Sequence, residues 1–124
     1  MILLDTNYLI RMLVAGSDEA KNVEAWLRGN MRLAASAIAW YEFECGPVDA
    51  NERNLVKTVL LGGIIAFDVR QSVVTARLFN DTGRSRKLRV DAMIASCAIV
   101  AECGLATANR DDFLPFVAHG LNLV

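Results

Sequence analysis

Histidine, cysteine and proline are all scarce in this chain, which has one histidine, three cysteines and two prolines among 124 residues. The cysteines are odd in number and none forms a Cys-x-x-Cys pair, which argues against a disulfide framework and for a reducing compartment. We expect them to pack as small apolar side chains. No uncharged apolar run reaches about 18 residues, so we expect no membrane-spanning helix. The apolar opening lacks a basic leader, so we expect no signal peptide and a cytoplasmic location.

An excess of charge of either sign is also missing. The formal net charge is −1, from 13 basic and 14 acidic residues. The chain therefore has no overall basic signature of a nucleic-acid-binding protein, and any such binding must be local or assisted by a metal ion. Hydrophobic residues make up 54% of the chain, which favours a well-buried sheet or a subunit interface. The length suits a single domain over residues 1–124.

Short apolar segments alternate with longer amphipathic ones along the whole chain. This alternation predicts an α/β fold, a three-layer α/β/α sandwich with a mostly parallel central sheet. We expect strands at 2–4, 32–36, 63–68, 104–109 and 120–124. We expect helices at about 6–14, 18–29, 37–45, 49–61, 70–82 and 90–102, with a short turn or helical loop at 110–113.

Several residues mark the ends of these helices. Thr6 or Asn7 is expected to cap the first helix, and Ser36 the third. The two prolines, Pro47 and Pro115, each fall beside a predicted helix end.

Polar side chains follow the predicted strands at the points where those strands end. Asp5 ends the first strand and Ser36 the second, and Thr107 and Asn109 follow the sequence "GLA". Because ligands of open α/β sheets bind beyond the carboxyl ends of the strands, we expect these side chains at one edge. Two further acids, Asp111 and Asp112, follow immediately.

Two predicted helices contribute one notable acid each. Glu42 lies under two turns into the helix that begins after Ser36, still near the same sheet edge. The alternative for Glu42 is an ordinary surface glutamate. Asp91 is the only acid of the apolar helix "RVDAMIASCAIV". Its alternative role is to stabilise the first turn, since acids favour helix N-termini.

Carboxylates gathered at one edge repel each other by roughly 1–4 kcal/mol per pair unless a proton or a cation intervenes. Oxygen ligands suit Mg²⁺ or Mn²⁺ and need no histidine or cysteine. The single histidine, His119, lies outside this group, and we expect it to be a surface or packing residue. Such a site suggests metal-assisted hydrolysis of phosphodiester bonds.

Four segments of the chain resemble, in order, the motifs of PIN domains, and more narrowly those of VapC-type toxins from bacterial and archaeal toxin–antitoxin pairs. The resemblance implies a Mg²⁺- or Mn²⁺-dependent endoribonuclease that hydrolyses RNA, is usually a homodimer and is held inactive by a cognate antitoxin. It also implies that Asp5, Glu42 and Asp91 are metal-site acids, with Asp5 and Asp91 as direct ligands. The segments are "LLDTNYLI", "SAIAWYEFECG", "VDAMIASCAIVAECGL" and "TANRDDF".

The fourth acid of the pattern is less clear. Many PIN domains have an acid where this chain has Asn109, whereas many VapC-like members have asparagine there and an acid just before a phenylalanine. Asp112 precedes Phe113 and is therefore our choice, with Asp111 as the alternative. The resemblance implies supporting roles for Asn7, Ser36, Thr107 and Asn109, which would hold the acids or water.

A basic segment, "RSRKLR" at 84–89, precedes Asp91 and is a candidate RNA-binding segment, although a solvated loop without a role is equally compatible with it. Its cationic residues are Arg84, Arg86, Lys87 and Arg89.

Two other functions compete with the nuclease. A receiver-type phosphoacceptor domain would use an acid such as Asp68, but it needs an acidic pair near the first strand and a lysine after a late one. A catalytically degenerate PIN domain acting as an RNA-binding or scaffold module stays open because of Asn109. Aromatic residues on the helices, including Trp26, Trp40 and Tyr41, are candidates for a dimer or antitoxin interface, although core packing alone is the favoured explanation for any single one.

Overall fold

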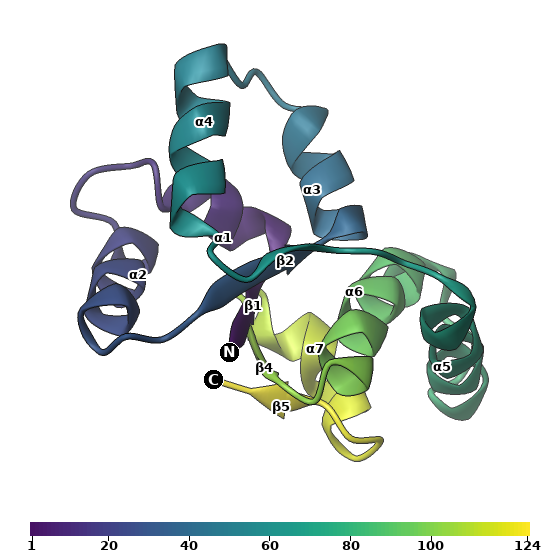
Figure 1. Ribbon diagram of the computed structural model, residues 1–124. Helices are drawn as coiled ribbons and strands as arrows, with labels where there is room; N and C mark the ends of the chain where they lie inside the picture. The colour runs from purple at the N-terminus through teal and green to yellow at the C-terminus, as the bar shows by residue number, and fades with distance from the viewer.

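Five short parallel strands form the centre of the protein (Figure 1). The computed structural model describes residues 1–124. Every neighbouring pair of strands is parallel, so the sheet that was expected to be mostly parallel is entirely so. The strands are β1 (Ile2–Leu4), β2 (Leu33–Ser36), β3 (Gly63–Ile65), β4 (Gly104–Ala106) and β5 (Asn122–Leu123), in the spatial order β3-β2-β1-β4-β5.

Helices cover both faces of this sheet. In Figure 1, α1 to α4 lie on one side of it and α5 to α7 on the other, as right-handed crossovers require when the strand order reverses. This arrangement confirms the predicted three-layer sandwich. No helix has both the length and the apolar character needed to cross a membrane. The helices are α1 (Thr6–Arg11), α2 (Asp18–Arg28), α3 (Ala37–Glu44), α4 (Ala50–Val59), α5 (Val69–Asp81), α6 (Arg89–Val100) and α7 (Arg110–Val117), with a short 3-10 helix η1 at Arg86–Leu88.

The core is built around β1 and α6. Leu3 and Leu4 are fully buried because β1 lies in the middle of the sheet with helices on both faces. Helix α6 is apolar on nearly all sides and is accordingly buried from Ile94 to Ala98. The rigid packing of these two elements fixes the positions of the residues at their ends, Asp5 after β1 and Asp91 at the start of α6.

The first helix differs from its prediction at both ends. Its cap is Asp5, whose side chain accepts a hydrogen bond from the Thr6 backbone N–H, whereas Thr6 or Asn7 had been expected. The reason is that strand β1 passes into α1 without a loop, so the last residue before the helix takes the capping position. The helix ends at Arg11 rather than near residue 14.

The last helix is longer than its prediction. Residues 110–113, expected to form a short turn or helical loop, begin the eight-residue helix α7. Pro115 lies inside this helix rather than beside its end. The helix persists because Phe113 and Phe116 are buried and pack edge to face with ring centroids 6.3 Å apart, which compensates for the missing proline N–H.

Smaller differences concern strand lengths and the cysteines. The strands expected at 63–68, 104–109 and 120–124 are each shorter, because pairing stops where the chain turns into the next element or ends. Cys97 is buried and Cys103 half-buried, as expected of small apolar side chains, but Cys45 is exposed because it caps the end of α3.

Candidate functional site

The candidate site lies at the carboxyl edge of the sheet, where β1 and β4 are neighbours. From β1 the chain crosses to β2 on one side, and β4 lies on the other, so this is a switch point of the topology, where α/β proteins bind ligands. Asp5 follows β1 and Thr107 follows β4. The Asp5 N–H donates to the Ala106 carbonyl at 2.9 Å, which extends the strand pairing up to the acid itself.

Asp5 is only 4% exposed and its carboxylate is held by three donors. The Thr6 backbone N–H reaches Oδ1 at 2.7 Å, and the Thr107 hydroxyl and the Asn7 amide reach Oδ2 at 2.7 and 3.0 Å. Burial raises the pKa of Asp5 above its ordinary value, and the charge of Glu42 adds to the rise. The three hydrogen bonds act in the opposite direction because they stabilise the ionised form.

Asn7 and Thr107 also connect the two strand ends to each other. The Asn7 side-chain oxygen accepts a hydrogen bond from the Ala108 N–H at 3.0 Å. The Thr107 hydroxyl accepts one from the Asn109 N–H, also at 3.0 Å. Asn109 thus takes part through its backbone, and its exposed side chain makes no hydrogen bond to any acid. The loop after β4 is therefore fixed relative to Asp5 before any ligand binds.

Glu42 comes to the site from helix α3, and Thr6 holds it there. The Thr6 hydroxyl donates to Glu42 Oε1 at 2.6 Å, across 36 positions of sequence. From the sequence, Thr6 was expected only as a helix cap; its position directly after the strand-end acid was the available signal. Ser36 makes no hydrogen bond to an acid, and its hydroxyl instead accepts from the Ala39 N–H at 3.0 Å and caps α3.

Asp91 faces the other carboxylates from the first turn of α6. Burial raises the pKa of Asp91 to about 6, with further contributions from three neighbouring negative charges. In order of decreasing effect these are Asp5, Asp112 and Glu42, and the Lys87 ammonium opposes them. Asp91 accepts no side-chain or capping hydrogen bond, which distinguishes it from Asp5. Each of the other three predicted acids therefore acts electrostatically on Asp91.

Other predicted residues lie at the margins of this group. Asp111 is exposed in the first turn of α7 and lines a surface pocket of about 420 Å³ together with Asp112 and Asn109. His119 is half-buried after α7, away from the acids. Asp68, the acceptor of the competing receiver-type function, caps α5 and pairs with Arg70 at 3.4 Å, so its carboxylate is already used.

The basic segment 84–89 leads into α6 and brings Lys87 close enough to act on Asp91. All four of its cationic side chains are exposed and none forms an ion pair. The guanidinium groups of Arg84 and Arg89 lie 4.9 and 5.2 Å from the centre of the Phe79 ring. Arg86 and Lys87 lie in η1, and Lys87 is the cation that Asp91 senses.

A hard divalent cation fits the chemistry of the four acids. They offer only oxygen donors, and none of them forms a salt bridge, although each of the four ion pairs in the protein uses another carboxylate. No three histidine, cysteine or acidic side chains stand close enough to form a ready-made metal site. Burial is the main cause of the raised pKa of Asp91, and the negative charge of the other three acids adds to it.

Comparison with solved structures shows the same fold in several toxin–antitoxin complexes. Chains of VapBC2 from Rickettsia felis, bound to a DNA fragment from their promoter, and of VapBC-1 from nontypeable Haemophilus influenzae are 22% and 19% identical to this chain, with TM-scores of 0.72 and 0.73. Both alignments cover 100% of this chain, and 98% and 97% of those chains. A toxin–antitoxin complex from Klebsiella pneumoniae is 24% identical, with a TM-score of 0.72 over 92% of this chain and 91% of that one.

Comparisons of the amino-acid sequence match this chain to a domain family and not to an individual curated protein. A search of curated protein sequences finds no match. The family model of the PIN domain, in contrast, matches residues 2–116, which include all four acids and the loop after β4. Because this model covers nearly the whole chain, and the sheet and the acids lie within the matched residues, the chain belongs to the PIN domain family.

Proposed function

We propose that this protein is a Mg²⁺- or Mn²⁺-dependent endoribonuclease and the toxin of a type II toxin–antitoxin pair. One observation carries the proposal: burial raises the pKa of Asp91 in α6 to about 6, and the carboxylates of Asp5 after β1, Asp112 in α7 and Glu42 in α3 all add to the rise. Membership of the PIN domain family and the fold shared with toxin–antitoxin complexes support the same function.

Each acid has a distinct part in this proposal. Asp5 and Asp91 would hold the cation, and Glu42 and Asp112 complete the catalytic group from the two flanking helices. When bound, the cation would supply activation of the attacking water and stabilisation of charge on the phosphate oxygens. The chain's own contribution is to orient the acids: Asn7 and Thr107 fix the Asp5 carboxylate, and Thr6 aims Glu42.

The RNA substrate would approach across the basic segment. Its four unpaired cations, Arg84, Arg86, Lys87 and Arg89, compensate locally for a chain whose net charge is −1. Phosphate contacts of this kind position a nucleic acid without reading its sequence. We place the scissile phosphate near Lys87, because this side chain already acts on the Asp91 carboxylate.

Protein partners are part of the proposal as well. A cognate antitoxin and a second copy of the chain are the partners that the resemblance implies, and the similar solved chains include members of toxin–antitoxin complexes. Large apolar side chains remain exposed on several helices, among them Tyr41, at 66%, on α3. Trp26 and Trp40 are half-buried instead, against Tyr8 and Phe43, and so serve mainly the monomer's packing.

The first test is cleavage of total RNA by the purified chain with Mg²⁺, with Mn²⁺ and with EDTA. We expect metal-dependent cleavage that falls at least about a hundredfold in Asp91→Asn, because the variant loses a cation ligand. Asp111→Asn is the matched control, since it removes an exposed neighbouring carboxylate, and it should cleave as the wild type does. Equal activity of Asp91→Asn and wild type would contradict the proposal.

A catalytically degenerate PIN domain that binds RNA is the second candidate. The observation in its favour is that no three metal-ligating side chains form a ready-made site. This function predicts RNA binding that is the same with EDTA and with Mg²⁺, and no cleavage in any of the three conditions. Calorimetric titration with Mn²⁺ separates the two candidates, because the nuclease must bind the cation and Asp91→Asn must weaken that binding.

A further inference from the structure

A pocket between α5 and α6 has no part in the acidic site, and we propose that it binds one unstacked base of a single-stranded RNA. The inference rests on the proposed function and adds a base-binding subsite to it. The pocket has a volume of about 330 Å³, a size typical of small-ligand sites. Its lining residues are Phe67, Ser72, Thr75, Ala76, Phe79, Arg89 and Met93.

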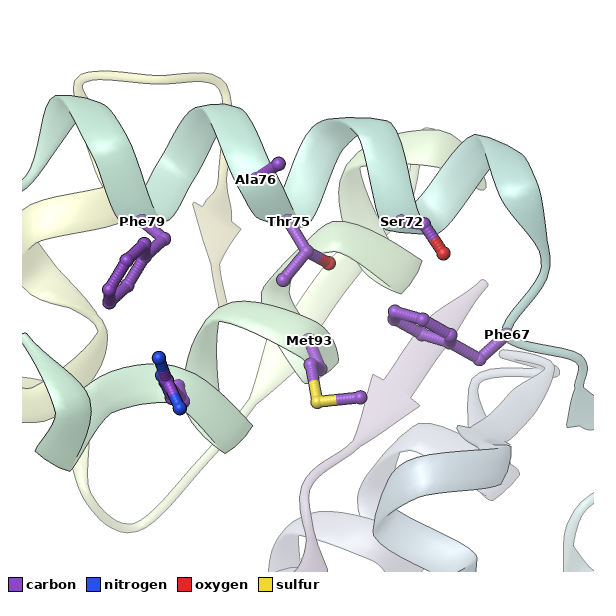
Figure 2. A pocket seen from close by; sticks show the side chains of 7 residues that line it. Phe67, Ser72, Thr75, Ala76, Phe79 and Met93 are labelled. Atoms are coloured by element: carbon purple, nitrogen blue, oxygen red, sulfur yellow. The ribbon is translucent and has the colours of Figure 1, made fainter. Parts of the chain in front are cut away.

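The pocket has aromatic walls and an apolar floor. Figure 2 shows Phe67 and Phe79 at its two ends, with Met93 opposite Thr75 and Ala76. Both phenylalanines are half-buried, so each ring packs against the protein and still presents a surface to the pocket. Flat apolar surfaces of this kind are what a base removed from its stack requires, because every base has an aromatic face.

Two arginine side chains pack on the Phe79 ring and enlarge the flat surface that it offers. Arg84 and Arg89 both lie on its ring, with the guanidinium carbons 4.9 and 5.2 Å from the ring centre. Arg84 is held there by the turn that ends α5: Gly83 and Arg84 both have positive φ, and the Arg84 N–H donates to the Phe79 carbonyl at 2.9 Å. Its guanidinium also donates to Asn80. A base in the pocket therefore meets a preformed stack of aromatic ring and guanidinium rather than a flexible arginine.

The position of the pocket suits a nucleotide near the cleavage site. Arg89 and Met93 line it from the face of α6 that packs on α5, whereas Asp91, two residues from each, points to the other acids. The pocket and the carboxylates are thus separated by about the diameter of one helix, roughly 10 Å. At about 3.4 Å per nucleotide in a stacked strand, this distance is spanned by a few nucleotides.

The polar groups of the pocket favour stacking over reading of base edges. The Thr75 hydroxyl already bonds the Gln71 carbonyl at 2.7 Å and the Ser96 hydroxyl at 2.9 Å. The Ser72 hydroxyl bonds the Asp68 carbonyl at 3.0 Å. Neither donor is free, so the pocket should accept several bases. The unpaired cations at its rim match the negative charge of an RNA backbone, which is why we favour RNA over an apolar protein segment.

The test is the affinity of the full chain, in EDTA, for a fluorescently labelled single-stranded RNA of about ten nucleotides. We expect Phe79→Leu to weaken binding about tenfold, because leucine keeps the apolar bulk and loses the stack. Phe79→Tyr should restore affinity to within about twofold of the wild type, since tyrosine keeps the aromatic face. Trp26→Leu is the control, a half-buried aromatic on α2 across the sheet.

The same RNA with one abasic position, moved along the strand, shows whether a base is the group bound. With the abasic site at one position, the RNA should bind the wild type about tenfold more weakly than the intact RNA does. Phe79→Leu should bind the abasic and the intact RNA with the same affinity, because it has already lost this contact. Equal losses for both proteins at every position would overturn the proposal. So would Phe79→Leu binding as tightly as Trp26→Leu, or no binding by the wild type.

Two further measurements identify the reason for a failure. If Phe79→Leu changes the sedimentation of the protein from dimer to monomer, the pocket faces a second copy of the chain and the base-binding proposal is wrong. Cleavage of total RNA is measured on the same preparations with Mg²⁺. Cleavage by the wild type together with unchanged binding by Phe79→Leu would overturn the subsite alone, whereas absence of both cleavage and binding would overturn the nuclease as well.

Discussion

The two acids predicted as direct cation ligands have opposite surroundings. Asp5, at the end of a strand, is 4% exposed and accepts hydrogen bonds from Thr6, Asn7 and Thr107. Asp91, in the first turn of α6, is half-buried and has no such donor, and its pKa rises to about 6. One side of the site is a hydrogen-bonded framework, and the other holds negative charge that is opposed only by the exposed Lys87 ammonium.

The difference indicates how the two sides of the site share the free-energy cost of burying carboxylates near one another. Hydrogen bonds to Asp5 offset part of the cost of its burial and hold its carboxylate in place without a ligand. Burial and repulsion at Asp91 are offset only when a proton or a cation arrives. The strand-end side therefore fixes geometry, and the helix side provides the affinity for a cation.

The largest effect expected from the contrast between Asp5 and Asp91 is on the free energy of unfolding. In the absence of metal, Asp5→Asn should lower the free energy of unfolding by about 1–3 kcal/mol, because the amide presents an N–H₂ group to donors that faced a carboxylate. Asp91→Asn should raise it by about 1 kcal/mol, since the variant removes repulsion at a site partly screened by solvent. Urea unfolding in EDTA measures both values, and changes of the same sign would refute the contrast.

The next effect concerns pH. Because the folded-state pKa of Asp91 is about 6 and the ordinary value is 3.8, the folded protein binds this proton more tightly than the unfolded chain does. The destabilisation from Asp91 is therefore fully present above about pH 6 and is relieved as the pH falls toward 3.8. The difference in melting temperature between wild type and Asp91→Asn, measured in EDTA, should narrow over this window. A difference independent of pH would show that Asp91 does not titrate there.

The smallest effect should follow Thr6→Val, which removes the hydroxyl that aims Glu42. Since the hydrogen bond joins two half-buried side chains, we expect a loss of about 0.5–1.5 kcal/mol in stability. Cleavage should fall several-fold while cation affinity stays close to that of the wild type, because Asp5 and Asp91 are unchanged. Thr58→Val is the control, since its exposed hydroxyl bonds only the Asn54 carbonyl on α4. An equal change in both variants would remove the special role of Thr6.

Local sequence patterns predicted the elements of the fold better than their ends. The buried apolar segment before Asp5, the helix cap at Ser36 and the apolar helix that begins at Arg89 are all present. Helix α7 extends beyond the short turn or helical loop expected at 110–113, because the burial of Phe113 and Phe116 outweighs the local preference of Pro115 against a helix. Such burial depends on residues distant in sequence, so a local pattern does not contain it.

The sequence by itself determined which acids stand at element ends, that their donors are all oxygen, and that they lie in the order of the PIN domain motifs. Only the tertiary structure decided how they are held. Thr6 reaches Glu42 across 36 positions and Thr107 reaches Asp5 across 102, contacts that no spacing rule specifies. The physical reason is that a strand end is set by its neighbours in the sheet: with β4 beside β1, the buried Asp5 gains the Thr107 donor, while Asp91, held by helix packing alone, gains none.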